Sequence, residues 1–422
     1  MASLSTALNL SRSSLATVSG RTALASRNIA NVGNADYSRK IALVSSLASG
    51  SIAISSYTRT ADKLLLDKLL AAASNSAASG SVLNSIKQLS ETVGDPESGV
   101  SPAGMMGKFQ TALQTYEQNP SDQTLAQNAI KSAGDLVRSL NGATAIIQDV
   151  RKQADTGMSE SVDRINSLLQ QFKVANDVVV RGSGSAEDLA DNLDMRDKTM
   201  KLLSEEIGIR AVTRSNNDIA LYTDSGVTLF ESVPRAVTMN PTTAMTAGVN
   251  GNAVYVDGVD VTSPTSSMAI RSGNLFGLAK IRDDVAVVYQ SQMDEVARGL
   301  VEAFSESDQS AVPALPNATG IFSYSGSPAV PAPGVAVAGL AGDIRPNASV
   351  DRAQGGVASR LRDGGINGAA YSYNTSGAAG FSDRLTGLID SLGAARGFDP
   401  ATQLDAQSSL MAFGTATGVV RI

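Results

Sequence analysis

The chain has 422 residues and a formal net charge of −6, and 42% of its residues are hydrophobic while only 4% are aromatic. It contains no cysteine and no histidine, which excludes disulfide scaffolds, thiol catalysis, the usual zinc sites and every catalytic triad that uses imidazole. The length predicts two to four domains with aliphatic cores. The sequence has no basic stripe, no run of about 18 apolar residues and no secretory leader pattern, so we expect no nucleic-acid partner, no membrane insertion and no cleaved signal peptide.

The first predicted element is a long helix that starts at Leu4 and ends near Gly33 and Asn34, which tolerate positive φ. Steps of four and three residues mark a heptad stripe along it, with positions Leu4, Leu8, Ser11, Leu15, Val18, Thr22, Ala25, Ile29 and Val32. This spacing is typical of a helix that offers one narrow face to a partner helix. Its large apolar members form the predicted assembly seam: Leu4, Leu8, Leu15, Val18 and Ile29. The alternative is an ordinary amphipathic helix packed on its own domain, because Ser11 and Thr22 are weak coiled-coil positions.

The end of this helix carries a family resemblance. Asn28-Ile29-Ala30-Asn31 is followed, after a short gap, by Tyr37-Ser38-Arg39-Lys40. The pattern resembles the N-terminal signature of bacterial flagellar rod, hook and hook-associated proteins, except that Asp36 stands where the family usually has glycine. The resemblance implies that residues 1–40 are the assembly helix of a flagellar axial protein.

Residues 41–60 are predicted to be an extended linker, because β-like alternation is short there and rich in serine. Residues 61–208 show wide apolar helix faces with polar opposite faces, which predicts a bundle of long antiparallel helices. The turn Asn119-Pro120-Ser121-Asp122 separates two of these helices. The next helix either runs on unbroken or breaks near Asn141-Gly142.

Two patterns at the end of the bundle invite a ligand-binding interpretation. The Gly182–Gly184 segment follows a valine run, as in a dinucleotide-binding turn, but Glu187 occupies the third glycine position and no βαβ pattern follows, so we expect a flexible helix connection. Asp191, Asp194 and Asp197 suggest a calcium loop, but the turn glycine and the final bidentate glutamate are missing. Helical spacing explains these three residues better.

The rest of the chain alternates β, irregular and helical patterns. Residues 209–269 are predicted to be a small inserted antiparallel β domain, with hairpin turns at Asn216-Asn217-Asp218 and Asp257-Gly258. Residues 305–380 are rich in proline and glycine and predict a second, irregular, surface-exposed insertion. Residues 394–422 form a weakly patterned tail. Two helical segments return to the bundle, 270–304 and 381–393.

Two further blocks resemble the hook-associated protein family. One is the run from Leu193 to Asp197, and the other is Gly273 to Leu278 followed by Arg282-Asp283. Asp283 and Asp284 are not a catalytic pair, because neighbouring helix residues point about 100° apart; we expect them and Arg282 to be solvated or paired with neighbouring subunits. The signature residues carried over are Asn28, Ala30, Asn31, Tyr37, Ser38, Arg39, Asp194, Arg196, Asp197, Gly273, Leu275, Gly277, Leu278, Arg282 and Asp283.

The motif blocks occur in the order found in the hook-associated protein 1 family, whose members join the flagellar hook to the filament. The patterns and the resemblance predict an α+β multidomain fold with a long N-terminal heptad helix, an elongated antiparallel helical bundle, a small inserted β domain and a second irregular insertion. The resemblance implies a structural protein that is not an enzyme and holds no cofactor or metal. It also implies a self-assembled ring, contacts with the hook protein and the next hook-associated protein, an export chaperone, and an extracellular location reached by the flagellar type III route.

Two other functions fit parts of the sequence. Another axial protein, such as the third hook-associated protein, the hook or the distal rod, would share the first signature, although the long bundle disfavours a rod or hook protein. An exported cell-wall enzyme would need two carboxylates facing each other across a cleft.

The end of the chain departs from the family pattern. Family members end in a second heptad helix that pairs with the first, and no such pattern follows Gly393. We therefore expect residues 394–422 to be a truncated or diverged tail. Without that partner the N-terminal helix is expected to attach loosely in the monomer and to order only against neighbouring subunits, because a lone helix is marginal in water.

Overall fold

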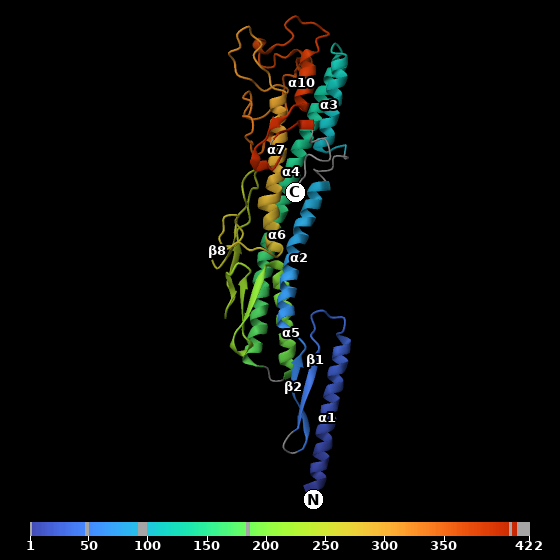
Figure 1. Ribbon diagram of the computed structural model, residues 1–422, viewed down its shortest axis with the longest axis vertical. Helices are drawn as coiled ribbons and strands as arrows, with labels where there is room; N and C mark the ends of the chain where they lie inside the picture. The colour runs from blue at the N-terminus through green and yellow to red at the C-terminus, as the bar shows by residue number, and fades with distance from the viewer. Residues whose placement is uncertain (1, 47–49, 92–98, 183–185, 405–406, 412–422) are drawn as a thin grey trace. The chain divides into compact units, whose positions relative to one another are not determined.

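The computed structural model describes residues 2–46, 50–91, 99–182, 186–404 and 407–411 (Figure 1). The chain divides into two compact units. Unit 1 consists of Met1–Val82, Thr156–Pro241 and Asn252–Ala279, and unit 2 of Leu83–Asp155, Thr242–Gly251 and Lys280–Ile422. The division differs from the domains expected from the sequence. The predicted bundle at 61–208 and the predicted β domain at 209–269 each contribute to both units.

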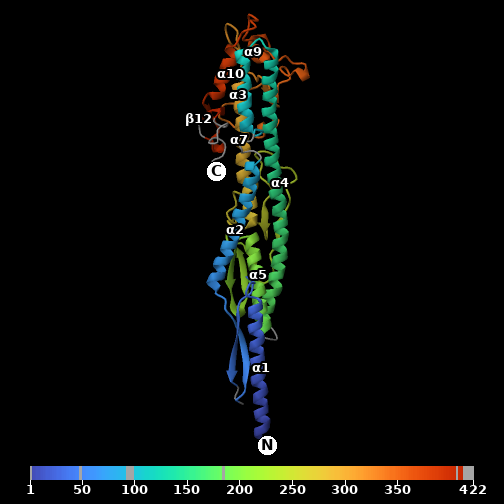
Figure 2. The same cartoon turned by 90° about the vertical axis from the view of Figure 1, so that its right-hand side faces the viewer.

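Unit 1 begins with helix α1 (Ala2–Ala30), followed by strands β1 (Lys40–Ser46) and β2 (Ile52–Arg59). The two strands pair antiparallel, so the predicted linker at 41–60 is a β-hairpin, and both views show α1 lying beside it (Figures 1 and 2). The helix also ends earlier than predicted. The backbone of Asn31 starts a turn in which the Asn34 N–H donates to the Asn31 carbonyl, and neither Gly33 nor Asn34 has positive φ.

The long helices follow the predicted periodicity. They are α2 (Lys63–Leu89), α3 (Pro102–Gln118), α4 (Gln123–Arg181) and α5 (Ala186–Glu206). Helix α4 is continuous for 59 residues, so there is no break at Asn141-Gly142; the Asn141 amide instead donates to the Ala341 carbonyl. The valine run before Gly182 is the last turn of α4 and not a strand, while Gly184 lies outside the described residues.

The β region forms two three-stranded antiparallel sheets with the orders β3-β4-β5 and β6-β7-β8. The strands are β3 (Ile209–Thr213), β4 (Ile219–Thr223), β5 (Thr228–Phe230), β6 (Val237–Met239), β7 (Val254–Val256) and β8 (Val259–Asp260). Both predicted hairpin turns are confirmed. Asn216 and Asn217 have φ of 57° within the turn η2 (Ser215–Asn217), and Asp257 and Gly258 have φ of 50° and 82°, as type I′ turns require.

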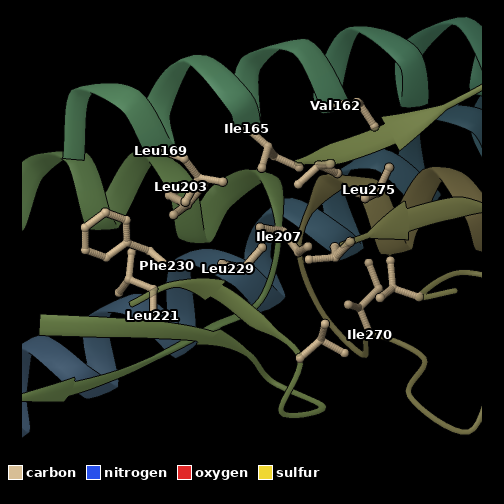
Figure 3. Close-up of a cluster of buried hydrophobic side chains, with 14 of the residues drawn as sticks. Val162, Ile165, Leu169, Leu203, Ile207, Leu221, Leu229, Phe230, Ile270 and Leu275 are labelled. Carbon is tan, nitrogen blue, oxygen red and sulfur yellow. The ribbon is translucent and has the colours of Figure 1, made fainter. Parts of the chain in front are cut away.

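The two sheets share one hydrophobic core with the helices of unit 1. Side chains from α4, α5, both sheets and α6 (Asn274–Lys280) point toward one another (Figure 3). Phe172 of α4 meets Phe230 of β5 edge-on, with ring centroids 5.0 Å apart. The sequence predicted a separate inserted domain here. The structure shows instead that the inner faces of the β region are covered by the helices, so its strands are part of unit 1.

Unit 2 is built around helix α7 (Ala286–Ala303), which follows a π-helical turn, η3 (Ile281–Val285). Helices α3 and α10 (Asp383–Gly393) pack together in this unit (Figure 2). Its short elements are β9 (Phe322–Ser323), α8 (Leu340–Asp343), β10 (Arg345–Pro346), η4 (Arg352–Gln354), α9 (Arg360–Asp363), η5 (Ala369–Tyr371), β11 (Arg396–Gly397), η6 (Pro400–Thr402) and β12 (Gln407–Ser408).

The segment 305–380 is irregular, as predicted, but it is not a surface insertion. Phe322 is fully buried and packs against Phe109 of α3 and Phe304, with ring centroids 5.8 and 5.2 Å away. Leu340 and Leu361 are also buried. The segment therefore supplies part of the core of unit 2. None of the helices in the described part of the chain is long and apolar enough to cross a membrane.

Candidate assembly surface

The side-chain amide of Asn28 fixes the end of α1 to the start of the hairpin. Its Oδ1 accepts hydrogen bonds from the Tyr37 hydroxyl (2.9 Å) and the Lys40 backbone N–H (3.1 Å), and its Nδ2 donates to the Lys40 carbonyl (2.9 Å). The amide thus pairs with the edge of β1 as a neighbouring strand would. Asn31 closes the last helical turn, with its Nδ2 donating to the Arg27 carbonyl (3.0 Å). These two signature asparagines therefore set the angle between helix and hairpin.

A charged node joins the hairpin to α5. The Lys40 side chain is 1% exposed and its Nζ pairs with Asp191 and with Asp194, the latter at 3.1 Å. Arg59 of β2 pairs with Asp194 (2.9 Å) and with Asp197. The three aspartates recur every three residues and so lie along one face of α5, where they bind cationic side chains of the hairpin. They belong to a helix, as predicted.

Arg27 of α1 completes this charged node, because its guanidinium pairs with Asp191 at 2.9 Å. Burial alone would raise the pKa of Asp191, but hydrogen bonds from Lys40 and Arg27 outweigh it and lower the pKa below its usual value. The bond to Asp191 in turn raises the pKa of Arg27. The carboxylate is therefore held ionised, and α1, the hairpin and α5 are joined through it. We call Arg27, Lys40, Arg59 and the three aspartates the signature node.

One signature residue and the residue that departs from the signature also support α5. Arg196 is buried and donates to the side chain of Asn176 (3.1 Å) and to the Asn217 carbonyl, and burial lowers its pKa. Asp36, the departure from the family pattern, lies 3.5 Å from Lys198 and 3.4 Å from Lys201. It gives the loop after α1 a second ionic contact with α5, which glycine would not provide.

The glycines of the second block allow close backbone approach in unit 1. Gly273 has φ of +94°, and a Cβ there would lie 2.7 Å from backbone atoms of Glu206 and Ile207. A Cβ at Gly277 would lie 2.6 Å from the Ala78 carbonyl oxygen on α2. Leu275 is fully buried in the core and Leu278 packs against it. These four signature residues are structural, since they bring α6 against α2 and the end of α5.

Arg282 and Asp283 differ from the expectation of solvent or inter-subunit contacts. In unit 2, Arg282 is 1% exposed and binds Asp283 through two nitrogens and Asp155 at 2.5 Å. Its carbonyl accepts from Arg151 (2.8 Å), and Asp283 accepts the Gly251 N–H (2.9 Å). The pair is therefore an internal ionic cluster. Asp284, by contrast, is exposed as predicted.

The predicted seam of α1 is exposed at every position. The largest exposed fractions are 80% for Leu4, 71% for Leu15 and 73% for Ile29, and Leu8 and Val18 are 60% and 55% exposed. The opposite face packs on the hairpin. There Thr17 and Leu24 are each 5% exposed, the Ser13 and Thr17 hydroxyls donate to the Ile52 carbonyl, and a Cβ at Gly20 would lie 2.8 Å from the Ile54 side chain.

This packing corrects the expectation of a loosely attached helix. From Ser13 to Asn28 the inner face of α1 is hydrogen-bonded or packed on β1 and β2, whereas residues 4–12 are all exposed. The seam has no partner among the described residues of the chain. A helix held firmly by one face while its apolar seam points to solvent is an arrangement suited to association with another helix.

Sequence reasoning missed part of the signature node. Ala30 and Arg39 carry the family resemblance but are exposed, while Lys40 and Arg59 make the buried contacts, both with Asp194. The one available signal was the i, i+3, i+6 spacing of the aspartates, since acidic residues on a single helix face need cationic partners when they are covered.

A cavity of about 190 Å³ lies beside the node, lined in part by Asp36, Asp62, Asp194 and Asp197. Three of these four carboxylates are already paired with lysine or arginine. No cluster of acidic residues suited to hold a metal ion occurs among the residues that the structure describes. The cavity therefore offers no opposed pair of free carboxylates for glycan chemistry.

Comparison with known proteins identifies the relatives of this chain. A family model described as the flagellar hook-associated protein FlgK helical domain matches residues 86–320. Flagellar hook-associated protein 1 of Escherichia coli K12 is 24% identical over 339 residues, which is 78% of this chain and 61% of that protein. The protein of the same name from Salmonella typhimurium is 25% identical over 335 residues, or 76% of this chain and 59% of that protein. The chain thus spans about three fifths of the length of these relatives.

A solved structure, the flagellar hook junction protein FlgK from Burkholderia pseudomallei, is also similar. It has a TM-score of 0.49 and 20% sequence identity, and the match covers 61% of this chain and 46% of that chain.

Proposed function

Because the chain belongs to the family defined by the flagellar hook-associated protein FlgK helical domain, we propose that it is a structural protein of the bacterial flagellum, without enzymatic activity, that joins hook to filament. It does so by assembling with copies of itself into a ring. The observation that carries the proposal is the exposed seam of α1, held in a fixed orientation by the signature node.

The energetics of the seam favour association. Burying one large aliphatic side chain stabilises a contact by about 1.5–3 kcal/mol, and Leu4, Leu8, Leu15, Val18 and Ile29 are all more than half exposed. A helix already docked on its hairpin loses less conformational freedom on binding than a free helix would. The seam therefore supports helix-to-helix contacts with neighbouring subunits.

We propose the proteins that contact the ring from the family to which the chain belongs. The ring contacts the hook protein on one side and the next hook-associated protein on the other, and an export chaperone binds the chain before assembly. The protein reaches the outside of the cell by the flagellar type III route. An exported cell-wall enzyme is disfavoured, because the carboxylates around the cavity beside the signature node are mostly neutralised by cations.

The experiment is genetic complementation in the native bacterium. We expect a deletion strain to form hooks without attached filaments and to release filament subunits into the medium. The wild-type gene restores filaments, and Leu15→Asp fails to do so, because a carboxylate in the seam would have to be buried on assembly. The matched control is Val174→Asp on α4, since Val174 is 67% exposed and Leu15 is 71% exposed.

Circular dichroism of both purified variants should match wild type, because both side chains are exposed in the monomer. Attached filaments in the deletion strain would refute the role at the hook–filament junction. Restoration of filaments by Leu15→Asp would show that the seam is not used.

A further inference from the structure

Strand β3 is the open edge of the sheet β3-β4-β5. The Gly208 carbonyl accepts a hydrogen bond from the Asp224 backbone N–H, and the Arg214 N–H donates to the Asp218 carbonyl. The backbone groups of the even-numbered residues of this segment therefore point toward β4. The N–H and C=O groups of Ile209, Ala211 and Thr213 therefore point away from the sheet. No described residue donates to them or accepts from them, which leaves three donors and three acceptors facing outward.

The other outer strands of unit 1 have at least one edge group occupied. The Asn166 amide bonds both the N–H and the carbonyl of Val237 on β6. The Arg235 N–H bonds the Leu229 carbonyl on β5, and the Ser266 hydroxyl bonds the Asp260 carbonyl on β8. In the hairpin, Asn28 occupies the edge of β1 and the Ser13 and Thr17 hydroxyls occupy that of β2.

Such blocking is how proteins keep strand edges from pairing with other chains. Among the described strands of unit 1, β3 alone is left without it. β3 has 5 residues, whereas β5 and β6 have 3 each, and the longer hairpin strands β1 and β2, with 7 and 8 residues, carry the contacts named above. This difference indicates that the edge of β3 is kept open for a partner.

The open edge lines a groove of about 470 Å³ between β3 and the start of α2. The groove is also lined by Lys63, Asp67 and Leu70 of α2. Lys63 donates to the Thr213 hydroxyl (3.1 Å) and so lies on the face of the odd-numbered β3 side chains. The Arg210 side chain is exposed and points to the other face. Neither cation forms an ion pair with any residue the structure describes.

We propose that this groove binds an extended segment of another protein, which adds to β3 as a fourth strand and carries two adjacent acidic residues. Successive side chains of a strand point to opposite faces. Two adjacent carboxylates would therefore reach the two faces of the edge, one toward Lys63 and one toward Arg210. The backbone bonds would supply affinity and the two ion pairs would supply selectivity, as in other cases of strand addition.

A second copy of the chain is a poor source for this strand. The described strand edges of unit 1 other than β3 are blocked as described above, and the described strands of unit 2 have only two residues each. Pairing with the β3 of a second copy would bring Lys63 and Arg210 of both copies to the same edge, where their like charges repel. The occupant is therefore a segment of a different protein that is extended before it binds.

The test uses the full chain and a fluorescein-labelled hexapeptide, Thr-Val-Glu-Glu-Val-Thr, with binding followed by fluorescence anisotropy. We expect saturable binding. A peptide with lysines in place of the two glutamates should bind at least about tenfold more weakly, because two attractive ion pairs become two repulsions. A peptide methylated on alternate backbone nitrogens should not bind, because it lacks the strand donors.

Two variants place the site on β3. Ala211→Pro removes an outward N–H without breaking a bond to β4, a substitution that edge strands tolerate, and it should abolish binding. Arg210→Glu should weaken binding of the glutamate peptide about tenfold and should strengthen binding of the lysine peptide by a similar factor. The matched control is Lys68→Glu, an exposed lysine on α2 outside the groove, which should bind like wild type.

The charge reversal keeps the test decisive if Ala211→Pro does not fold. The proposal is overturned if no saturable binding occurs up to about 1 mM peptide. It is also overturned if the methylated peptide binds as well as the unmethylated one and both β3 variants bind the glutamate peptide as well as wild type does. It is also overturned if sedimentation shows self-association of the chain that Ala211→Pro abolishes, because the edge would then hold a second copy.

Discussion

Replacing Lys40 tests whether the signature node holds α1 and the hairpin against α5. Lys40→Met keeps most of the side-chain stem and removes the charge. The Lys40 side chain is 1% exposed and that of Asp194 is 10% exposed, so the substitution leaves a nearly buried carboxylate with one cation fewer. Breaking a buried ion pair by removing one partner typically destabilises by about 3–5 kcal/mol.

The expected cost here is smaller, because neither aspartate is left alone. Asp194 keeps Arg59 at 2.9 Å, and Asp191 keeps Arg27 at 2.9 Å and is 43% exposed. We therefore expect Lys40→Met to destabilise the contact of α1 and the hairpin with α5 by about 2 kcal/mol, which makes the equilibrium for opening this contact about 30-fold more favourable. The loss should be local, since the node joins α1 and the hairpin to α5 and does not reach the core of unit 2.

Amide hydrogen exchange read by mass spectrometry measures this opening directly. Peptides covering residues 28–60 should exchange about 30-fold faster in Lys40→Met, while peptides of α7 should not change. The matched control is Lys131→Met, whose side chain is 73% exposed in a pair with Asp135 and whose loss should cost well under 1 kcal/mol.

A double-mutant cycle with Asp194→Asn separates the ion pair from lost packing. We expect a coupling free energy of about 1 kcal/mol between the two sites. Exchange in residues 28–60 at the wild-type rate, or a coupling near zero, would show that the node does not hold the hairpin and would refute the reasoning.

Two further predictions concern packing and pH. Gly277→Ala should destabilise unit 1 by about 1–3 kcal/mol, because its Cβ would lie 2.6 Å from the Ala78 carbonyl oxygen. The control is Gly107→Ala on α3, which should be neutral or slightly stabilising, because nothing lies within 4 Å of a new Cβ there. Urea unfolding measures the stability of both variants. The pKa of Asp191 is lowered in the folded protein by its bonds to Lys40 and Arg27, so its stabilising contribution is present above its unfolded pKa, near 4, and is lost as the pH falls through the lower folded value. Urea midpoints measured from pH 7 down to about pH 3 should therefore fall less steeply for Asp191→Asn than for wild type, and equal slopes would contradict this assignment.

Local pattern predicted the elements of this chain better than it predicted their associations. The heptad spacing of α1 and the hairpin turns at Asn216-Asn217 and Asp257-Gly258 follow from residues close together in sequence. The hairpin at 41–60 was missed, because its strands are half exposed and rich in serine. Their partner is α1, whose contribution to pairing comes through single side chains such as Asn28 and Thr17. No alternation in the strands encodes that contact.

The buried charges could not be found from sequence for a related reason. Arg282 reads as a surface residue because its neighbour is Asp283, yet its other partner, Asp155, lies 127 residues earlier in the chain. Segment 305–380 likewise has no periodicity, but Phe322 packs against both Phe109 and Phe304. Burial at such positions depends on contacts that only the folded chain brings together.

The two faces of α1 would separate folding from the proposed assembly. Apart from the buried Leu24, the inner face uses small and polar residues, Ser13, Thr17 and Gly20, which allow close approach to β2 and satisfy its edge. The outer face keeps the large apolar residues, which gain little from the fold of the monomer because they stay in solvent. If the large residues lay on the inner face, they would stabilise the monomer and leave nothing to bury between subunits. The exposed seam therefore adds little to the stability of the isolated chain, and the proposed association would gain free energy by burying it.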